Sequence, residues 1–332
     1  MGIKGLTQLI KQHSPDSIET MNLHKLSGKR VGIDASLFMY KMLINMRSAN
    51  NAYLTNKDGK VVSHITGIFY KTANYLAVNI TPIYIFDGKP PQNKTDVLKQ
   101  RHEKVANAKS AMENNTLTEE QLNHLEKQTV RLTKEHVDDI KQLLDLMGVS
   151  YVQADGEAEA YASEMCRQGF IDYVVTEDMD TLAFGCPRMV RTCLDKSIKR
   201  SDIISVIDLE SMLQGFTLSY EQFVDLCILC GCDYCANIPR IGNKTAYNLI
   251  KNMKSIEAVL PTLKNVPDGY EMKYKDSRRL FTMYHDTLDM QTLTIHHSTR
   301  KMDELYNHLT NSCGMSDTRV KNTMKKMSGG YK

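Results

Sequence analysis

The stretch RVGIDAS, residues 30–36, is a short apolar run that closes on an acid, Asp34. Two other stretches share this form: IYIFDGKPP (83–91, with Asp87) and DYVVTEDMD (172–180, with Asp178 and Asp180). Short runs rich in Val, Ile, Tyr and Phe predict buried β-strands. An acid adds nothing to the packing of a buried strand, whereas the carboxyl ends of strands in an open α/β sheet border the crevice where ligands bind. The three stretches therefore predict an α/β fold with an acidic site at the strand ends.

Two more segments carry acids in patterned positions, GEAEA at 156–160 and GCDYC at 231–235. So many carboxylates in one crevice would repel one another unless divalent cations sat among them. Two such ions about 4 Å apart can activate a water molecule and stabilise the departing oxygen of a phosphodiester. The sequence thus predicts an enzyme of metal-dependent phosphate chemistry. Its candidate metal ligands are Asp34, Asp87, Glu157, Glu159, Asp178, Asp180 and Asp233.

The spacing of the acids predicts how each pair is presented. Asp178 and Asp180 are two apart in what we expect to be extended chain, so both should point to the same side. Glu157 and Glu159 are also two apart, but at a predicted helix start, where a regular helix would splay them by about 200°. We expect this pair to straddle the helix N-terminus, where Gly156 loosens the turn.

Strands and helices alternate along most of the chain. The predicted strands are 29–34, 81–87, 150–154, 172–177 and 189–193. The predicted helices are 36–47, 63–79, 133–147, 157–168 and 220–231. This alternation favours a twisted, mostly parallel sheet flanked by helices on both faces.

The segment 90–132 departs from this alternation, because it is highly charged and poor in aliphatic residues. Between Lys89 and Lys109 there are six basic residues and two acidic ones, a net charge of 6 − 2 = +4. A second helix is predicted to start at Thr118, with Gln121 completing a capping box. Two polar helices joined by a loop indicate an excursion from the domain that can order on a ligand.

Composition sets the broad class. The chain has 332 residues, 42% of them hydrophobic, and a net charge of +3, so it can bury a sizeable core as one large α/β domain or a domain with an insertion. It contains no apolar stretch near the roughly 18 residues of a membrane-spanning helix. We expect a soluble, intracellular protein, in which the eight cysteines are free thiols rather than disulfides.

Four of these cysteines, at 227, 230, 232 and 235, also have a spacing that invites a zinc site. The first two lie in YEQFVDLCILCG, which has the period of a buried helix with Ser219 and Gln222 as its capping box. Core helices commonly carry cysteine as a small hydrophobic residue, so the pattern favours core packing over zinc. Gly231 is the expected end of this helix, and it leaves Asp233 in the following loop.

Basic residues are placed to complement the acids. Lys94 and Arg101 are seven apart and lie on one face of a predicted helix, where they can stabilise developing phosphate charge. The segment 235–255 predicts a helix, a hairpin and a second helix. Gly242 permits a tight turn there, and the following helix start presents backbone N–H groups, with Lys244 beside them, to a DNA phosphate.

These motifs resemble the flap endonuclease family. The resemblance is carried by MGIKGL, VGIDAS, the helix from Tyr40 to Arg47, SHITGIFYK, YIFDGKPPQNK, GEAEA, TEDMDTLAFG and EQFVDLCILCGCDYC…IPRIG. It is collinear from Met1 to about residue 260 and weaker from there to about residue 327.

The resemblance implies a PIN-like 5′-nuclease fold with a core at 1–260. Within this core, 90–132 would form a helical arch and cap, and 219–255 a helix-two-turn-helix motif that binds DNA. Residues 261–332 would be a C-terminal extension that packs on the core and frays at its end.

The resemblance also implies the activity: structure-specific cutting of 5′ flaps and of gapped or nicked DNA, with 5′-to-3′ exonuclease activity, in replication and repair. The implied cofactors are two Mg²⁺ ions, for which Mn²⁺ can substitute, and a K⁺ ion at the hairpin. The implied partner is branched DNA. The protein is expected to act as a monomer and not to bind a membrane. The seven acids match the metal ligands of the family.

Further roles follow from the same resemblance. The catalytic residues besides the metal ligands would be Lys94, Arg101 and Tyr40, with Tyr40 stacking on a base. The implied DNA contacts are Gly2, Arg47, Lys71, Arg191, Arg240, Gly242 and Lys244.

Three departures from the family pattern bear on these expectations. Arg240 stands where the family hairpin has a glycine, which removes backbone freedom and leaves K⁺ binding open. Gly156 stands where the family often has a capping serine, and we expect Asp155 to cap the helix instead. The sliding-clamp peptide of cellular relatives does not occur after residue 300, so the sequence leaves both a clamp partner and a viral origin open. A cellular protein would be nuclear, and a viral one could work at a cytoplasmic replication site.

Other functions remain as alternatives. A sibling nuclease that acts on bubbles, Holliday junctions or recessed ends would share the same motifs. The short arch of about forty residues, 90–132, between the FDGKPP and EAEA blocks favours the flap enzyme. A catalytically silent protein that binds DNA junctions would be expected to have lost carboxylates, and none is lost here. Asp178 to Thr181 also fits the D-x-D-x-T pattern of aspartyl phosphatases, but that function leaves Asp34 and Asp87 unexplained.

Overall fold

The computed structural model describes residues 2–48, 52–89, 103, 105–108, 110–112, 118–283, 285, 288–289 and 291–328. The chain forms two compact units, each assembled from three separate segments. Unit 1 comprises Met1–Lys25, Gly88–Lys94 and Ala154–Leu293, and unit 2 comprises Leu26–Asp87, Thr95–Gln153 and Thr294–Lys332. None of the described helices combines the length and the hydropathy needed to cross a lipid bilayer.

Unit 2 is built on four strands in the order β2-β3-β4-β8. Their bounds are β2 (Arg30–Asp34), β3 (Thr81–Phe86), β4 (Ser150–Gln153) and β8 (Ile295–His296). The β2–β3 and β3–β4 pairs are parallel, and β8 adds an antiparallel edge. The helices are α2 (Ala35–Asn45), α3 (Ser63–Ala77), α5 (Glu119–Thr129), α6 (Lys134–Met147), α14 (Met302–Asn307) and α15 (Asp317–Ser328).

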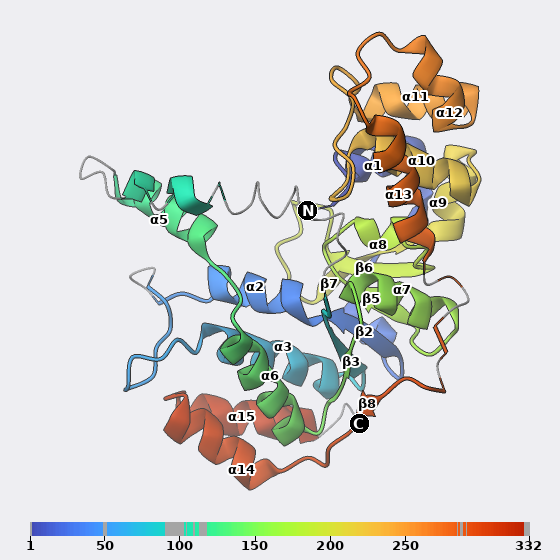
Figure 1. The fold of residues 1–332 in the computed structure, drawn as a ribbon. Helices are drawn as coiled ribbons and strands as arrows, with labels where there is room; N and C mark the ends of the chain where they lie inside the picture. Colours follow the sequence, from blue (N-terminus) through green and yellow to red (C-terminus); the bar gives the residue numbers. More distant parts are fainter. Residues whose placement is uncertain are drawn as a thin grey trace. The chain divides into compact units, whose positions relative to one another are not determined.

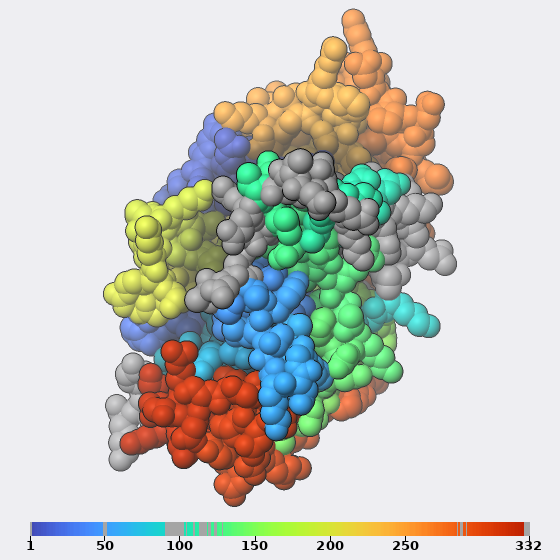
Figure 2. All heavy atoms as spheres, turned by 90° about the vertical axis from the view of Figure 1, so that its left-hand side faces the viewer, coloured from blue at the N-terminus to red at the C-terminus, as the bar shows by residue number. Residues whose placement is uncertain are grey.

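The C-terminal helices of unit 2 pack on segments that are distant in sequence. Figure 2 shows the red C-terminal segment beside the blue segment that precedes α3. The side-chain amide of Asn56, in a hairpin turn between residues 55 and 61, donates to the carbonyl of Ser312 at 2.9 Å. The C-terminal extension therefore contributes to the same compact unit as α3 and β2.

Unit 1 contains the other four strands, in the order β1-β7-β6-β5. Their bounds are β1 (Ile18–Asn22), β7 (Ile203–Asp208), β6 (Arg188–Thr192) and β5 (Tyr173–Val175). The β5–β6 pair is parallel, and the other two pairs are antiparallel. The helices are α1 (Leu6–His13), α7 (Ala158–Arg167), α8 (Asp180–Ala183), α9 (Leu209–Phe216), α10 (Tyr220–Cys230), α11 (Asn243–Met253), α12 (Ile256–Val259) and α13 (Tyr270–Thr282) (Figure 1).

The predicted α/β fold with a mostly parallel sheet is confirmed for the predicted strands, because β2, β3, β4, β5 and β6 pair in parallel with one another within their units. The antiparallel pairs come from β1, β7 and β8, which the sequence analysis missed. The capping boxes predicted at Thr118 and Ser219 are both present.

The cysteines at 227 and 230 are buried on α10, in a core cluster that includes Leu9, Phe216 and Phe223. This is the core role that the sequence analysis favoured for them. Burial raises the pKa of the Cys230 thiol to about 12, so this group stays protonated at neutral pH.

Candidate active site

Gly2 lies against two carboxylates of unit 1. A Cβ atom added to Gly2 would come within 1.9 Å of Asp178 Oδ1 and within 2.5 Å of Asp180 Oδ1. The backbone φ of Gly2 is +79°, a conformation that favours glycine. Glycine therefore serves two purposes here, since it adopts the required backbone angle and leaves room for both acids. This places the predicted DNA contact Gly2 and the predicted ligands Asp178 and Asp180 at one point.

Asp178 and Asp180 come together through a turn. The prediction of extended chain at these residues is wrong, because β5 ends at Val175 and Asp180 already begins α8. The backbone N–H of Asp180 donates to Asp178 Oδ1 at 3.2 Å, which fixes the turn. Both side chains are buried, with residue exposures of 7% and 3%. Two buried acids facing the same glycine carry a large desolvation penalty that a cation can offset.

Glu157 and Glu159 straddle the start of α7, as the spacing predicted. Glu157 is the residue just before the helix, and Glu159 lies in its first turn. The expectation that Asp155 caps this helix is wrong, because no side chain caps the N-terminus of α7 and Asp155 Oδ2 instead lies 3.4 Å from the hydroxyl of Tyr161.

Tyr234, the residue after Asp233, lies near the acids of α7 and α8. Burial raises the pKa of Tyr234 well above its ordinary value, and the nearby charges of Glu157, Asp180 and Glu159 raise it further. The phenol therefore stays protonated beside the carboxylates. Asp233 is the adjacent residue, in the loop that follows α10 after Gly231, where the sequence analysis expected it. In unit 1, acids of α7 and α8 therefore lie near one buried tyrosine, whose neighbour in the chain is Asp233.

The other two predicted ligands belong to unit 2. Asp34 ends β2, is 4% exposed, and caps α2 by accepting the N–H of Leu37 at 3.0 Å on Oδ1. Asp87 directly follows β3 and is exposed, and its carbonyl accepts the side-chain amide of Gln153 at 2.6 Å. Asp34 therefore has a structural role in addition to the ligand role that the sequence predicts.

In unit 2, the predicted catalytic residue Tyr40 lies on α2, and the predicted DNA contacts Arg47 and Lys71 lie after α2 and on α3. Tyr40 is half-buried on α2, six residues after Asp34. The guanidinium of Arg47 stacks 3.7 Å from the ring centre of Tyr53, and the ammonium of Lys71 lies 5.1 Å from that of Tyr75. These cations are oriented by neighbouring aromatic rings.

Arg191 in unit 1 is held by an ion pair. Its Nη2 donates to Glu177 Oε2 at 3.0 Å, and both side chains are about 15% exposed. Glu177 was missed by the sequence analysis, although it stands in the quoted motif just before Asp178. Together with Gly2, Lys4 and Lys11, this pair lines a groove of about 640 Å³. The groove thus places three cations, Lys4, Lys11 and Arg191, on the same side of unit 1 as Gly2.

The predicted hairpin before α11 is present. Arg240 has φ +70°, and the helix begins at Asn243 after Gly242. Lys244 is exposed in the first turn. The side-chain amide of Asn243 donates to the carbonyl of Gly5 at 3.0 Å, which joins the start of α11 to the N-terminal segment. Arg240 thus adopts a left-handed conformation at the position where the family has glycine. Lys94 and Arg101 lie outside the described residues.

The donors gathered in unit 1 fit a hard divalent cation. All are carboxylate oxygens, and Mg²⁺ typically binds through one or two carboxylates while keeping waters and taking phosphate oxygens. Within the ranges that the structure describes, no three His, Cys, Asp or Glu side chains are arranged to hold an ion by themselves. The Asp178–Asp180 pair at Gly2 is consistent with the few protein ligands that Mg²⁺ needs.

Comparisons with known proteins agree with this fold. A family model described as the XPG N-terminal domain matches residues 1–108, and one described as the XPG I-region matches residues 148–233. Both describe parts of the 5′-nuclease superfamily. The solved structure of flap endonuclease-1 from Methanococcus jannaschii matches with a TM-score of 0.71 at 28% identity, covering 93% of this chain and 95% of that one. The catalytic core of Rad2 in complex with DNA substrate has the same TM-score, 0.71, at 19% identity, covering 98% of this chain and 100% of that one, and it shares the fold.

Relatives of known sequence are similar over the whole chain. Flap endonuclease 1 of Debaryomyces hansenii is 38% identical over 342 residues, covering 100% of this chain and 89% of the relative. Flap endonuclease 1 of Glycine max is 38% identical over 333 residues, covering 98% of this chain and 86% of the relative. The chain belongs to the flap endonuclease family.

Proposed function

We propose that this protein is a structure-specific 5′ flap endonuclease that hydrolyses DNA phosphodiesters and also has 5′-to-3′ exonuclease activity. The observation that carries the proposal is the 38% identity to Flap endonuclease 1 over the full chain. The sequence keeps all seven acids and both basic residues of the family motifs, which argues against a catalytically silent relative.

The seven carboxylates are the proposed ligands of two Mg²⁺ ions, for which Mn²⁺ can substitute. Bound there, the ions would lower the pKa of a water molecule and offset the charge of the scissile phosphate. Gly2 supports this assignment, because its lack of a side chain lets the carboxylates of Asp178 and Asp180 lie together against the N-terminal segment. Lys94 and Arg101 would share the developing phosphate charge, and Tyr40 would stack on a base next to the scissile bond.

The DNA partner is proposed to be branched duplex, such as a 5′ flap, a nick or a gap, bound by a monomer. The turn before α11 and the cations Arg240 and Lys244 would contact backbone phosphates, which position DNA without reading its sequence. Arg47, Lys71 and Arg191 would add further phosphate contacts. A K⁺ ion at the hairpin is part of the same proposal, with carbonyl oxygens of the turn as its ligands.

The test is single-turnover cleavage of DNA labelled at the 5′ end, with a double flap, a bubble and a four-way junction compared in Mg²⁺ and in EDTA. We expect the double flap to be cut fastest, near the base of the flap, and only with Mg²⁺. Faster cutting of the bubble or the junction would assign the chain to a sibling activity. Absence of cutting on all three substrates, with tight binding retained, would contradict the enzymatic function.

A further inference from the structure

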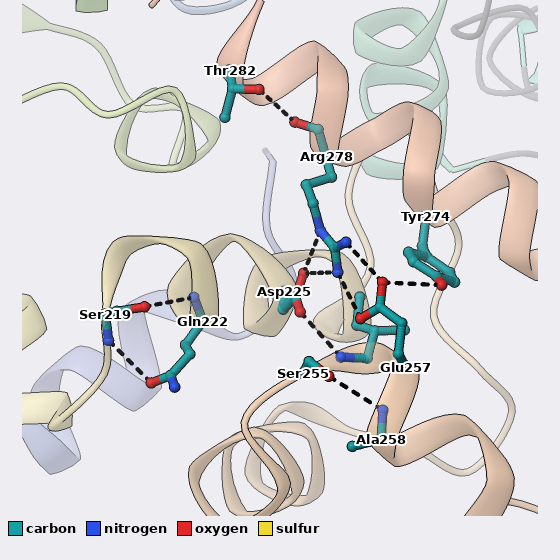
Figure 3. A network of polar contacts seen from close by, with 10 residues as sticks. Ser219, Gln222, Asp225, Ser255, Glu257, Ala258, Tyr274, Arg278 and Thr282 are labelled. Atoms are coloured by element: carbon teal, nitrogen blue, oxygen red, sulfur yellow. Dashed lines mark hydrogen bonds and ion pairs between the residues drawn. The ribbon is translucent and has the colours of Figure 1, made fainter.

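Arg278 on α13 joins two other helices of unit 1 through one side chain (Figure 3). Its Nε and Nη2 donate to Oδ1 of Asp225 on α10, at 2.9 and 2.6 Å. Its Nη1 and Nη2 also donate to Oε1 and Oε2 of Glu257 on α12, at 2.8 and 3.1 Å. The planar guanidinium thus binds a carboxylate at each of its two edges, a geometry that only arginine offers.

The remaining bonds of the two acids extend the network. Oδ2 of Asp225 accepts the backbone N–H of Ile256 at 3.1 Å, the first residue of α12. The hydroxyl of Tyr274, one turn before Arg278, donates to Oε1 of Glu257 at 3.2 Å. Asp225 is only 4% exposed, and burial raises its pKa. A buried acid of this kind is tolerated because charged and backbone donors satisfy both of its oxygens.

The network closes the base of a long loop. The bond between Asp225 and Ile256 joins positions that are 31 residues apart. Arg278 on α13 binds Asp225 at one end of this loop and Glu257 at the other. Between these ends lie the last turn of α10, Asp233, the hairpin with Arg240, and all of α11. At the far end, the turn is held by its own bonds, such as that from the side-chain amide of Asn237 to the carbonyl of Ile241 at 3.2 Å.

We propose that Arg278 is a positioning residue for duplex binding, which fixes the angle between α10 and α12 and thereby the place of the hairpin and the start of α11 on the DNA backbone. The proposal rests on the proposed function, because it assigns duplex contact to that hairpin. Contacts that are preorganised bind more tightly than contacts that must be ordered on binding. Loss of the guanidinium should therefore weaken duplex affinity more than it slows the chemical step of bound DNA.

The experiment compares Arg278→Met with Arg279→Met as a matched control. Arg279 is the next residue, is 77% exposed, and pairs only with Asp276 on its own helix among the ion pairs of the described residues, so its loss should change little. The dissociation constant for nicked duplex is measured by fluorescence anisotropy in EDTA, and the single-turnover rate is measured at saturating flap DNA in Mg²⁺. For Arg278→Met we expect the dissociation constant to rise about tenfold and the saturating rate to stay near that of the unchanged chain.

Two further variants separate positioning from folding. Arg278→Lys should not restore affinity, because an ammonium group cannot bind both carboxylates through a fork. If Arg278→Met does not fold, Glu257→Gln replaces it, because the Glu257 side chain is 46% exposed and its change leaves Asp225 paired. A folded variant that binds nicked duplex as tightly as the Arg279→Met control would overturn the proposal.

Hydrogen exchange separates this proposal from the proposed function. The backbone N–H of Ile241 bonds to the carbonyl of Ile238 at 3.0 Å within the hairpin, and its exchange reports how well the turn is held without DNA. We expect faster exchange there in Arg278→Met than in Arg279→Met. If the unchanged chain neither cuts nor binds flap DNA, the proposed function fails on its own, whereas equal exchange in the two variants would contradict the positioning role.

Discussion

At the scale of single residues, the absence of one side chain shapes the candidate site. The carboxylate oxygens of Asp178 and Asp180 occupy the space that a methyl group on Gly2 would need. Buried acids in such a pair attract a cation only if the cation and a phosphate can reach them. The glycine therefore lets the N-terminal segment pack directly against the two carboxylates, and the bond from the N–H of Asp180 to Asp178 Oδ1 fixes the turn that brings them together.

This geometry predicts the effect of Gly2→Ala. The added Cβ would lie 1.9 Å from Asp178 Oδ1, so the carboxylate or the N-terminal segment must move. A displacement on this scale near reacting groups can lower a rate about 100-fold, and we expect single-turnover cleavage to fall by this order while duplex affinity changes little. The control is Gly169→Ala, because Gly169 has φ +73° but no neighbour within 4 Å of an added Cβ. Full activity of Gly2→Ala would contradict this account.

At the scale of elements, the hairpin before α11 carries a strained residue. Arg240 is exposed and has φ +70°, a conformation that costs a residue with a Cβ about 1 kcal/mol or more. The bonds from the N–H of Ile241 to the carbonyl of Ile238 and from the amide of Asn237 to the carbonyl of Ile241 hold the turn in this conformation. The sequence could locate the departure from glycine, but only the backbone shows that the left-handed conformation is retained.

Arg240→Gly should stabilise the protein by about 1 kcal/mol, because glycine adopts this φ without strain. Urea denaturation of the variant and of Arg240→Ala separates strain from charge, since both variants lose the guanidinium and only glycine relieves the backbone. We expect the glycine variant alone to gain stability. Equal stability of the two variants would show that the hairpin carries no strain at this residue.

The stability that the ion pair between Arg278 and Glu257 gives to the folded protein should depend on pH. Bonds from Arg278 lower the pKa of Glu257 to about 2, from an ordinary value of 4.5. Because the pKa is lower in the folded state, the charged Glu257 stabilises that state at pH values above 4.5. This stabilisation is lost as the pH falls from 4.5 towards 2. Glu257→Gln should therefore be less stable than the unchanged chain at pH 7, and the difference should shrink below pH 4.5. Thermal unfolding of both proteins between pH 7 and pH 3 measures this difference, and a difference independent of pH would contradict the role of the ion pair.

At the scale of the whole molecule, the sequence analysis predicts five strands, β2 to β6, from their apolar runs. It misses β7, although the residues IISVID are mostly buried and rich in β-branched side chains. It misses β1, whose residues IETMN are mostly polar and partly exposed, and β8, which has only two residues. The bounds of the compact units could not be predicted either, because each unit joins segments that are distant in sequence, such as Thr294–Lys332 with Leu26–Asp87. Packing of this kind leaves no periodic signal in any one segment.

Part of the candidate site could be predicted from the sequence. Acids at strand ends stand out because a buried strand does not need them, so the sequence reveals Asp34, Asp87, Asp178 and Asp180. The turn at Asp178 and the tyrosine among the acids could not be predicted, since both depend on how α7, α8 and the α10 loop pack. Arg278 gives no signal at all, because it lies in a charged helix beside a second arginine.

The central claim is that these carboxylates hold the metals that cleave DNA, and Asp180→Asn tests it most directly. Single-turnover cleavage of a 5′-labelled double flap in Mg²⁺ is measured beside the dissociation constant for the same DNA in EDTA. The amide keeps the size of the side chain but removes its charge, so we expect cleavage to be abolished while binding survives through the phosphate contacts. Cleavage by Asp180→Asn within about tenfold of the unchanged chain, a difference of only about 1.4 kcal/mol in the barrier, would contradict the assignment of the metal site.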